Sequence, residues 1–265
     1  MIDFNSKKGF ICDMDGVIYH GNQVLPGAVE FVNWLQRENK EYLFLTNNSG
    51  YTPRELQQKL ARMGLDVPED HFYTSALATA TFLKNQAPGC SVYAIGEAGL
   101  FNALYDAGIT MNDVNPDYVV VGEGKAYSLD TVTKAVNLVL AGAKLIGANS
   151  DISGPIEDGI APGCRALVAP IELATGKQAY FCGKPNPLMM RTGLNILGCH
   201  SAEAVMVGDR MDTDVISGME SGMSTVLVLS GVSSRETIST FAYRPTVVLD
   251  GVGSIVELAD GTKEL

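Results

Sequence analysis

The sequence predicts an α/β protein whose doubly wound parallel-sheet core carries an inserted second α/β domain. Short apolar runs recur, each ending at a polar residue or glycine, as expected for strands covered by helices on both faces. Amphipathic stretches separate these runs, which gives the strand, helix, strand order of a parallel sheet. The length of 265 residues exceeds the usual domain of about 100–150 residues, which leaves room for an insertion.

Four apolar runs are expected to form strands of the core sheet. Ligands bind beyond the carboxyl ends of the strands in such sheets, so Asp13, Thr46 and Asp209, which follow three of the runs, are expected to converge. The strands are expected at 10–12, 42–45, 204–207 and 225–229, and the helices at 27–39, 52–64, 188–197 and around 212–222.

The middle of the chain has an α/β pattern of its own. We therefore expect a core formed by 1–86 and 179–265, with an inserted α/β cap at 87–178. Gly122-Glu123-Gly124 lacks the third glycine of a dinucleotide-binding loop and predicts an ordinary turn. The cap strands are expected at 92–95, 118–121, 144–146 and 166–168, and its helices at 99–108 and 128–142.

Composition narrows the classes of partner. Lys and Arg number 19 against 30 Asp and Glu, a net charge of −11, so a broad surface for a nucleic acid polymer is not expected.

The five cysteines include no CxxC pair, which favours reduced, buried thiols. No signal peptide or membrane-length apolar run is present, so a cytoplasmic location is expected. The sequence does not decide whether the protein forms a homo-oligomer through the cap.

The first chemical motif is the pair Asp13 and Asp15, followed by Gly16. One carboxylate can attack a phosphate while the other moves a proton, and a divalent cation makes such close like charges tolerable. Mg²⁺ suits this role, because it binds carboxylate and phosphate oxygens. The motif alone also fits a calcium loop or a solvated turn. Asp209 is placed to complete the metal site, and Asp214 could orient a metal-bound water or Lys184.

The segment 46-TNNSG-50 follows an apolar run and precedes a predicted helix. The Thr46 hydroxyl and the amides after it can hold phosphate oxygens, helped by the helix dipole. The alternative is a plain helix cap, since Thr52 and Glu55 form a capping-box pattern.

The segment 183-GKPNP-187 contains two prolines that would hold Lys184 in a fixed position before a helix. Such a lysine can neutralise both a nucleophilic aspartate and a bound phosphate. A surface turn is the alternative.

Together, DMDGV, TNNSG, GKPNP and GDRMDTD resemble the four signature motifs of the haloacid dehalogenase superfamily of phosphatases. The stretches 75–83, 147–151 and 229–234 are similar to those of the NagD-type members, which are sugar and nucleotide phosphatases with a large α/β cap. The resemblance covers nearly the whole chain. It implies Mg²⁺-dependent hydrolysis of small-molecule phosphate monoesters through an aspartyl-phosphate.

The resemblance also implies a role for each motif residue. Asp13 would be the nucleophile and Asp15 the general acid and base. The metal would be held by Asp13, the backbone carbonyl of Asp15, and Asp209, with Asp214 in or next to the metal shell. The phosphate or the rest of the substrate would contact Thr46, Asn47, Asn48, Lys184, Arg210, Met211, Asp212 and Thr213.

The loop 147-GANSDISGPIEDG-159 is expected to face the active site and to set selectivity, because its Gly, Asn and Asp content suits a turn with exposed polar groups. Asn149 and Asp151 are its candidate substrate-binding residues. An ordinary surface loop is the alternative.

Two other functions use related residues. A phospho-accepting receiver module would be about half this length, and its acceptor aspartate would follow a later strand than the acidic pair. A phosphotransferase or phosphomutase on the same core would pass the phosphoryl group to a second sugar, and the motifs do not distinguish it from a hydrolase.

Overall fold

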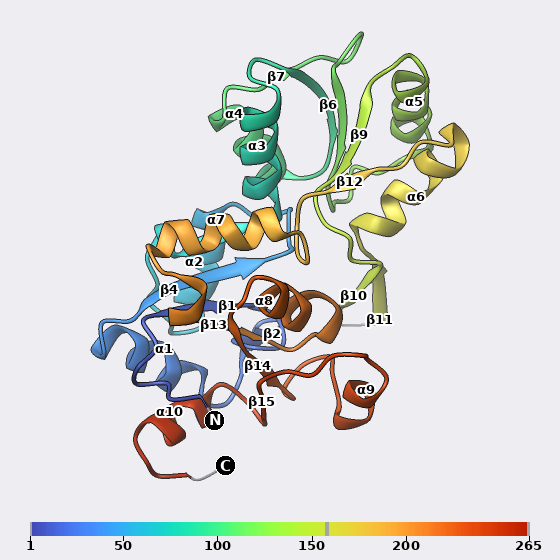
Figure 1. Cartoon of the computed structure of the whole chain (residues 1–265). Helices are drawn as coiled ribbons and strands as arrows, with labels where there is room; N and C mark the ends of the chain where they lie inside the picture. Colours follow the sequence, from blue (N-terminus) through green and yellow to red (C-terminus); the bar gives the residue numbers. More distant parts are fainter. Residues whose placement is uncertain (1, 157–158, 264–265) are drawn as a thin grey trace. The chain divides into compact units, whose positions relative to one another are not determined.

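The computed structural model describes residues 2–156 and 159–263. Its contacts divide the chain into two compact units, and each is considered by itself (Figure 1). Unit 1 comprises Met1–Thr46, Gln57–Tyr73 and Pro187–Leu265. Unit 2 comprises Asn47–Leu56 and Thr74–Asn186.

Unit 1 contains a six-stranded sheet in the order β15-β14-β13-β1-β4-β5. Numbered along the chain this order is 6-5-4-1-2-3, that of a doubly wound sheet, and the strands from β15 to β4 pair in parallel. This confirms the predicted fold class. The strands are β1 (Gly9–Cys12), β4 (Glu41–Thr46), β5 (Phe72–Thr74), β13 (Ala204–Gly208), β14 (Ser224–Val228) and β15 (Val247–Leu249), with a separate pair β2 (Tyr19–His20) and β3 (Gln23–Val24).

Helices cover this sheet because their apolar residues recur on one side. In α1, Phe31 and Trp34 are buried, and the Trp34 ring meets the Phe10 ring of β1 edge-on at 5.4 Å between centroids. The helical segments are α1 (Ala28–Arg37), α2 (Pro53–Arg62, shared by the two units), η1 (Glu69–His71), α7 (Pro187–Leu197), η2 (Ser201–Glu203), the π-helical η3 (Met211–Val215), α8 (Ile216–Glu220), α9 (Arg235–Ser239) and α10 (Gly253–Ala259).

Unit 2 contains a second parallel sheet, in the order β12-β9-β8-β6-β7. In chain order this is 5-4-3-1-2, the arrangement of flavodoxin-like sheets, whose strand order reverses between β6 and β8. An antiparallel hairpin, β10 with β11, lies outside it. The strands are β6 (Ser91–Ile95), β7 (Thr110–Met111), β8 (Tyr118–Val121), β9 (Lys144–Gly147), β10 (Ser153–Ile156), β11 (Gly159–Pro162) and β12 (Tyr180–Phe181).

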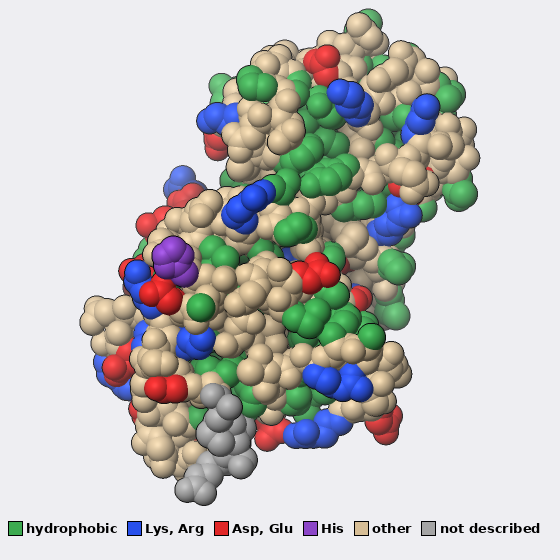
Figure 2. Space-filling model, viewed as in Figure 1, with side chains coloured by type: hydrophobic (Ala, Val, Ile, Leu, Met, Phe, Trp, Pro, Cys, Tyr) green, Lys and Arg blue, Asp and Glu red, His purple; other side chains and the backbone are tan. Residues whose placement is uncertain are grey.

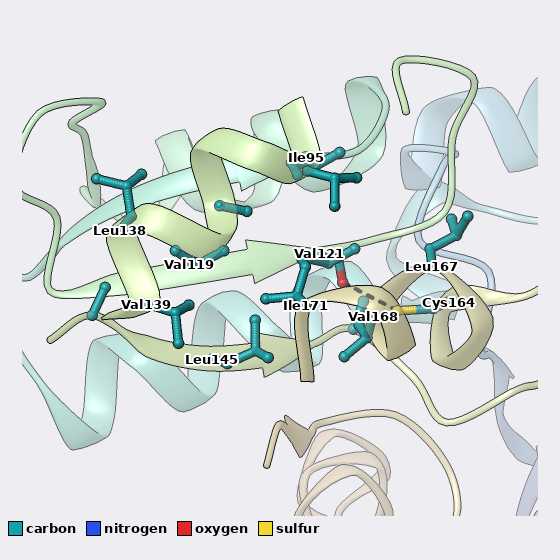
Figure 3. Packing of buried hydrophobic residues seen from close by; sticks show 14 residues of the cluster. Ile95, Val119, Val121, Leu138, Val139, Leu145, Cys164, Leu167, Val168 and Ile171 are labelled. Carbon is teal, nitrogen blue, oxygen red and sulfur yellow. Dashed lines mark hydrogen bonds between the residues drawn. The ribbon is translucent and has the colours of Figure 1, made fainter. Parts of the chain in front are cut away.

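The core of unit 2 forms where α5 and α6 pack on the sheet (Figure 3). Val119 and Leu145 of the strands meet Val168 and Ile171 of α6 there. The predicted strand at 166–168 was wrong, because these residues lie inside α6. A short apolar run does not distinguish a strand from the buried side of a helix. The helices are α3 (Ser75–Gln86), α4 (Ala98–Asp106), α5 (Leu129–Leu140) and α6 (Cys164–Thr175).

The boundaries of unit 2 differ from those expected for the cap, 87–178. Helix α3 groups with unit 2 because it packs against α4. The segments 47–56 and 179–186 also group with unit 2 through their contacts.

The face shown in Figure 2 carries both signs of charge, and the thiols are buried. On the face shown in Figure 2, basic and acidic side chains are interspersed. All five cysteines are buried and have no disulfide, as expected. Among the described residues, no helix is both long and apolar enough to cross a membrane.

Candidate active site

A cluster of three buried carboxylates lies at the carboxyl end of the unit 1 sheet. Asp13 follows β1 and Asp209 follows β13, and these neighbouring strands pair in register through Cys12 and Val207. Asp214 belongs to η3, shortly after Asp209. One carboxylate oxygen from each aspartate lies within 4.8 Å of the other two. The sheet order reverses between β1 and β13, which is the ligand-binding position of doubly wound folds.

Three glycines leave the space that these carboxylates occupy. At Gly16, whose φ of +76° favours glycine, an added Cβ would lie 2.6 Å from Oδ2 of Asp209. At Gly208 it would overlap Asp214, and at Gly231 it would lie 2.6 Å from Cγ of Asp209. Any larger residue at these positions would therefore displace an acidic side chain.

Backbone hydrogen bonds orient the carboxylates. Oδ2 of Asp209 accepts from the N–H of Val232 at 2.7 Å, and Oδ2 of Asp214 accepts from the N–H of Arg210 at 3.1 Å. Asp13 is 9% exposed, and Asp209 and Asp214 are exposed by 2% or less. Buried like charges at this spacing repel one another, and a bound cation or a proton relieves that repulsion. The oxygen-only set fits a hard divalent ion such as Mg²⁺.

Asp15 differs from these three aspartates because 54% of its side-chain surface is exposed. Its Oδ1 lies 3.4 Å from Nδ1 of His20. Surrounding atoms desolvate the carboxyl group and raise its pKa above the ordinary value, while His20 and Lys59 oppose this shift. A carboxyl group with a raised pKa is suited to giving and taking a proton.

The residues of segment 210–213, expected to line the substrate side, differ in burial: Asp212 is exposed, Arg210 is half-buried, and the other two are buried. Arg210 and Asp212 form an ion pair at 2.9 Å. Met211 and Thr213 are buried, and Met211 packs in a hydrophobic cluster with residues that include Leu227.

Other predicted site residues belong to unit 2. Lys184 is only 1% exposed. Its backbone N–H and its backbone carbonyl both form hydrogen bonds with the side chain of Asn47. The Lys184 N–H donates to Oδ1 of Asn47 at 2.7 Å, and Nδ2 of Asn47 donates to the Lys184 carbonyl at 3.1 Å. Nδ2 of Asn47 also donates to Oδ1 of Asp151 at 3.0 Å. Asn149 is fully buried, and its Nδ2 donates to the Asn47 carbonyl at 2.6 Å.

Asn48 and Thr52 arrange the chain after Asn47. Oδ1 of Asn48 accepts from the N–H groups of Gly50 and Tyr51, which makes a tight turn. Thr52 and Glu55 form the predicted capping box at the start of α2.

Sequence analysis missed Glu123, which it placed in an ordinary turn. The Glu123 carboxylate accepts from the N–H and hydroxyl of Ser49 and from Nδ2 of Asn149. Burial is the largest influence on its pKa, which is raised. The one available signal was an acidic residue close behind an apolar strand, separated from it by Gly122.

Unit 2 also has a pocket of about 390 Å³, whose lining includes Tyr51, Glu97, Glu123 and Lys125. Glu97 and Glu123 follow β6 and β8, between which the strand order reverses. Glu123 thus borders this pocket as well as the loop that begins at Asn47.

A doubly wound core with an acidic cluster at its switch point is typical of enzymes that transfer phosphoryl groups with a divalent metal ion. The chain belongs to the haloacid dehalogenase-like hydrolase family, and it is a phosphatase of the NagD type. The family pattern described as haloacid dehalogenase-like hydrolase matches residues 10–110, and a related HAD-hydrolase-like pattern matches residues 181–255.

Similarity to curated relatives extends over nearly the whole chain. The dihydroxyacetone phosphatase of Corynebacterium glutamicum (strain R) is 48% identical over 251 residues, 95% of this chain and 90% of the relative. The ribonucleotide monophosphatase NagD of Escherichia coli (strain K12) is 43% identical over 94% of this chain and 98% of its own length. An acid sugar phosphatase of Staphylococcus epidermidis is 40% identical, over 90% of this chain and 93% of its own.

Solved structures agree with this family. NagD from E. coli K-12 superposes with a TM-score of 0.88 at 42% identity, covering 94% of this chain and 98% of NagD. A 4-nitrophenylphosphatase from Thermotoga maritima superposes with a TM-score of 0.92 at 32% identity, covering 99% of this chain and all of that one. The fold, cap included, is therefore that of NagD-type phosphatases.

Proposed function

We propose that the protein hydrolyses small-molecule phosphate monoesters, either sugar phosphates or nucleoside monophosphates, with Mg²⁺ and through a phosphoenzyme at Asp13. The observation that carries the proposal is the buried cluster of Asp13, Asp209 and Asp214 at the switch point of the sheet. The similarity to a dihydroxyacetone phosphatase, a ribonucleotide monophosphatase and an acid sugar phosphatase supports the substrate class.

The proposed reaction has two displacements. In the first, a carboxylate oxygen of Asp13 attacks the phosphorus atom and the ester P–O bond breaks, while Asp15 gives its proton to the departing alcohol oxygen. In the second, Asp15 takes a proton from a water molecule whose oxygen attacks the phosphorus. The bond to Asp13 then breaks, which leaves inorganic phosphate and returns both aspartates to their starting states.

Charge stabilisation is assigned to a metal and to Lys184. Asp13, Asp209 and Asp214, with the backbone carbonyl of Asp15, would hold Mg²⁺, which when bound supplies positive charge to the phosphate oxygens. Lys184 would add a second positive charge.

Direct contacts to the substrate are also proposed. The hydroxyl of Thr46 and the backbone N–H groups of the residues after it would donate to phosphate oxygens. The half-buried Arg210 and the exposed Asp212 would contact the rest of the substrate.

Phosphate release tests the proposal directly. Purified protein is assayed against nucleoside monophosphates, sugar phosphates, dihydroxyacetone phosphate, pyridoxal phosphate and glycerol phosphate, with Mg²⁺ and with EDTA. We expect release that requires Mg²⁺ and no acceptor alcohol. Activity unchanged by EDTA would contradict the metal assignment. Turnover only in the presence of a second sugar would show a phosphotransferase instead.

A further inference from the structure

The main chain of Lys184 is held by the side chain of Asn47, the residue that follows β4, and Asn47 is in turn held by residues that follow the unit 2 strands β8 and β9. Asn47 supplies the first link, since its amide group accepts from the Lys184 N–H and donates to the Lys184 carbonyl. Oδ1 and Nδ2 of Asn47 therefore both bind the backbone of the same residue, Lys184. Asn47 is 7% exposed and Lys184 is 1% exposed, so water is largely excluded from these bonds.

A second layer of residues fixes Asn47 itself. The Asn47 carbonyl accepts from Oγ of Ser75 at 2.5 Å and from Nδ2 of Asn149 at 2.6 Å. Nδ2 of Asn149 also donates to Oε1 of Glu123 at 3.1 Å. Oε2 of Glu123 accepts from the N–H of Ser49 at 3.0 Å and from its hydroxyl at 3.2 Å. Glu123 thus joins both sides of the Asn47 segment, through Asn149 on one and Ser49 on the other.

Two glycines permit this close approach. An added Cβ at Gly183 would lie 2.6 Å from Oδ1 of Asn47 and 2.7 Å from Cβ of Asn149. An added Cβ at Gly122 would lie 2.9 Å from Oγ of Ser49. Contacts below 3.0 Å require a shift of the neighbour, so glycine at both positions keeps the network closed.

We infer that Glu123 is a positioning residue for Lys184, acting through Asn149 and Ser49 on Asn47, whose amide group in turn sets the Lys184 main chain. This inference rests on the proposed role of Lys184 in binding phosphate. It assigns Asn47 and Asn149 to holding the lysine, in place of the direct substrate contacts expected for Asn47 from its motif and for Asn149 from its loop.

The carboxylate chemistry of Glu123 makes the inference testable with a small change. The two oxygens of Glu123 accept from three donors, whereas a glutamine offers one oxygen and one N–H₂ group. In Glu123→Gln, an oxygen kept toward Ser49 would place the new N–H₂ group against the N–H₂ group of Asn149. The link to Asn47 through Asn149 is then lost, while the bonds to Ser49 and the size of the side chain are unchanged.

A matched control is available in the same unit. Glu172 is 7% exposed, accepts from the N–H of Ala179 at 2.7 Å and pairs with Arg165. Glu172→Gln removes a buried carboxylate that has no hydrogen bond to Asn47, Asn149 or Ser49. Melting temperatures of both variants show whether each remains folded at the assay temperature.

The first readout is a double-mutant cycle with Lys184→Met, scored as kcat/KM for phosphate release. We expect Glu123→Gln to lower kcat/KM by about 10- to 100-fold, the cost of a misplaced charged group. In the Lys184→Met background the same change should alter kcat/KM by less than about twofold. Equal losses in both backgrounds would overturn the inference, as would wild-type kcat/KM in Glu123→Gln.

The second readout does not depend on turnover. Hydrogen exchange of the Lys184 amide should be faster in Glu123→Gln than in wild type and unchanged in Glu172→Gln. Unchanged exchange in both variants would overturn the inference. Full activity of Lys184→Met would instead overturn the proposed role of Lys184, while the exchange experiment would still test whether Glu123 positions it.

Discussion

Replacing Gly231 by alanine gives a sharp test of the acidic cluster. The added Cβ would lie 2.6 Å from Cγ and 2.7 Å from Cβ of Asp209. Rotating the carboxylate cannot relieve this clash, because the Asp209 Cβ itself is too close. Ordinary contact begins at 3.4 Å, so Asp209 must move by about 0.8 Å or the backbone must open by the same amount.

The expected result follows from that displacement. A shift near 1 Å in a catalytic array can cost about 100-fold, so we expect Gly231→Ala to lower kcat/KM by about 10- to 100-fold. Because Asp209 is a proposed Mg²⁺ ligand, the Mg²⁺ concentration for half-maximal activity should rise. Overpacking should also cost about 1–3 kcal/mol of unfolding free energy.

The assay is phosphate release across a Mg²⁺ titration, at a temperature well below the melting point of the variant. Gly251→Ala is the control, because its added Cβ would meet only the carbonyl oxygen of Pro26, at 3.9 Å. If Gly231→Ala matches wild type in both kcat/KM and Mg²⁺ dependence, Asp209 does not act where the structure places it.

Three further predictions address single residues. Asp13→Asn should keep its fold by circular dichroism and lose at least about 10³-fold in kcat, since it removes the nucleophile; near-wild-type phosphate release would refute this role. Asp15→Asn should release 4-nitrophenol from 4-nitrophenyl phosphate in a burst followed by slow turnover, because that leaving group needs little protonation; an equal loss in both phases would argue against a proton-transfer role. Burial raises the pKa of Cys164 and of Cys182 to about 12, so both thiols should react with a thiol reagent only after unfolding; rapid reaction of the native protein would contradict their burial.

The arrangement of Asp13 and Asp209 could be predicted from the sequence because it depends on a rule of topology. Each residue directly follows an apolar run, and parallel strands bring such positions to one edge of the sheet. That expectation needed neither the residue-by-residue pairing of the two strands nor the distance between the two carboxylates. Asp214 does not follow a strand, and it could be included only because it lies five residues beyond Asp209 in the GDRMDTD motif.

The role of Glu123 could not be predicted, because it depends on contacts between distant segments. Gly122 and Gly183 matter only once β8, β9 and β12 lie side by side, and nothing local to either glycine shows this. Met211 is a similar case: its burial against Leu227 is decided by tertiary packing around a five-residue π-helical segment.

The pairing of β1 also has a consequence for synthesis on the ribosome. Gly9 of β1 pairs with Glu41 of β4 on one side and with Ala204 of β13 on the other. One edge of this fully buried strand therefore stays unpaired until a segment nearly two hundred residues further along the chain has been synthesised. At about 5–20 residues per second, that wait is on the order of 10–40 s. The strands of the second sheet, Ser91 to Phe181, all emerge within this interval. The inserted sheet can thus be complete before translation supplies the strand that covers β1.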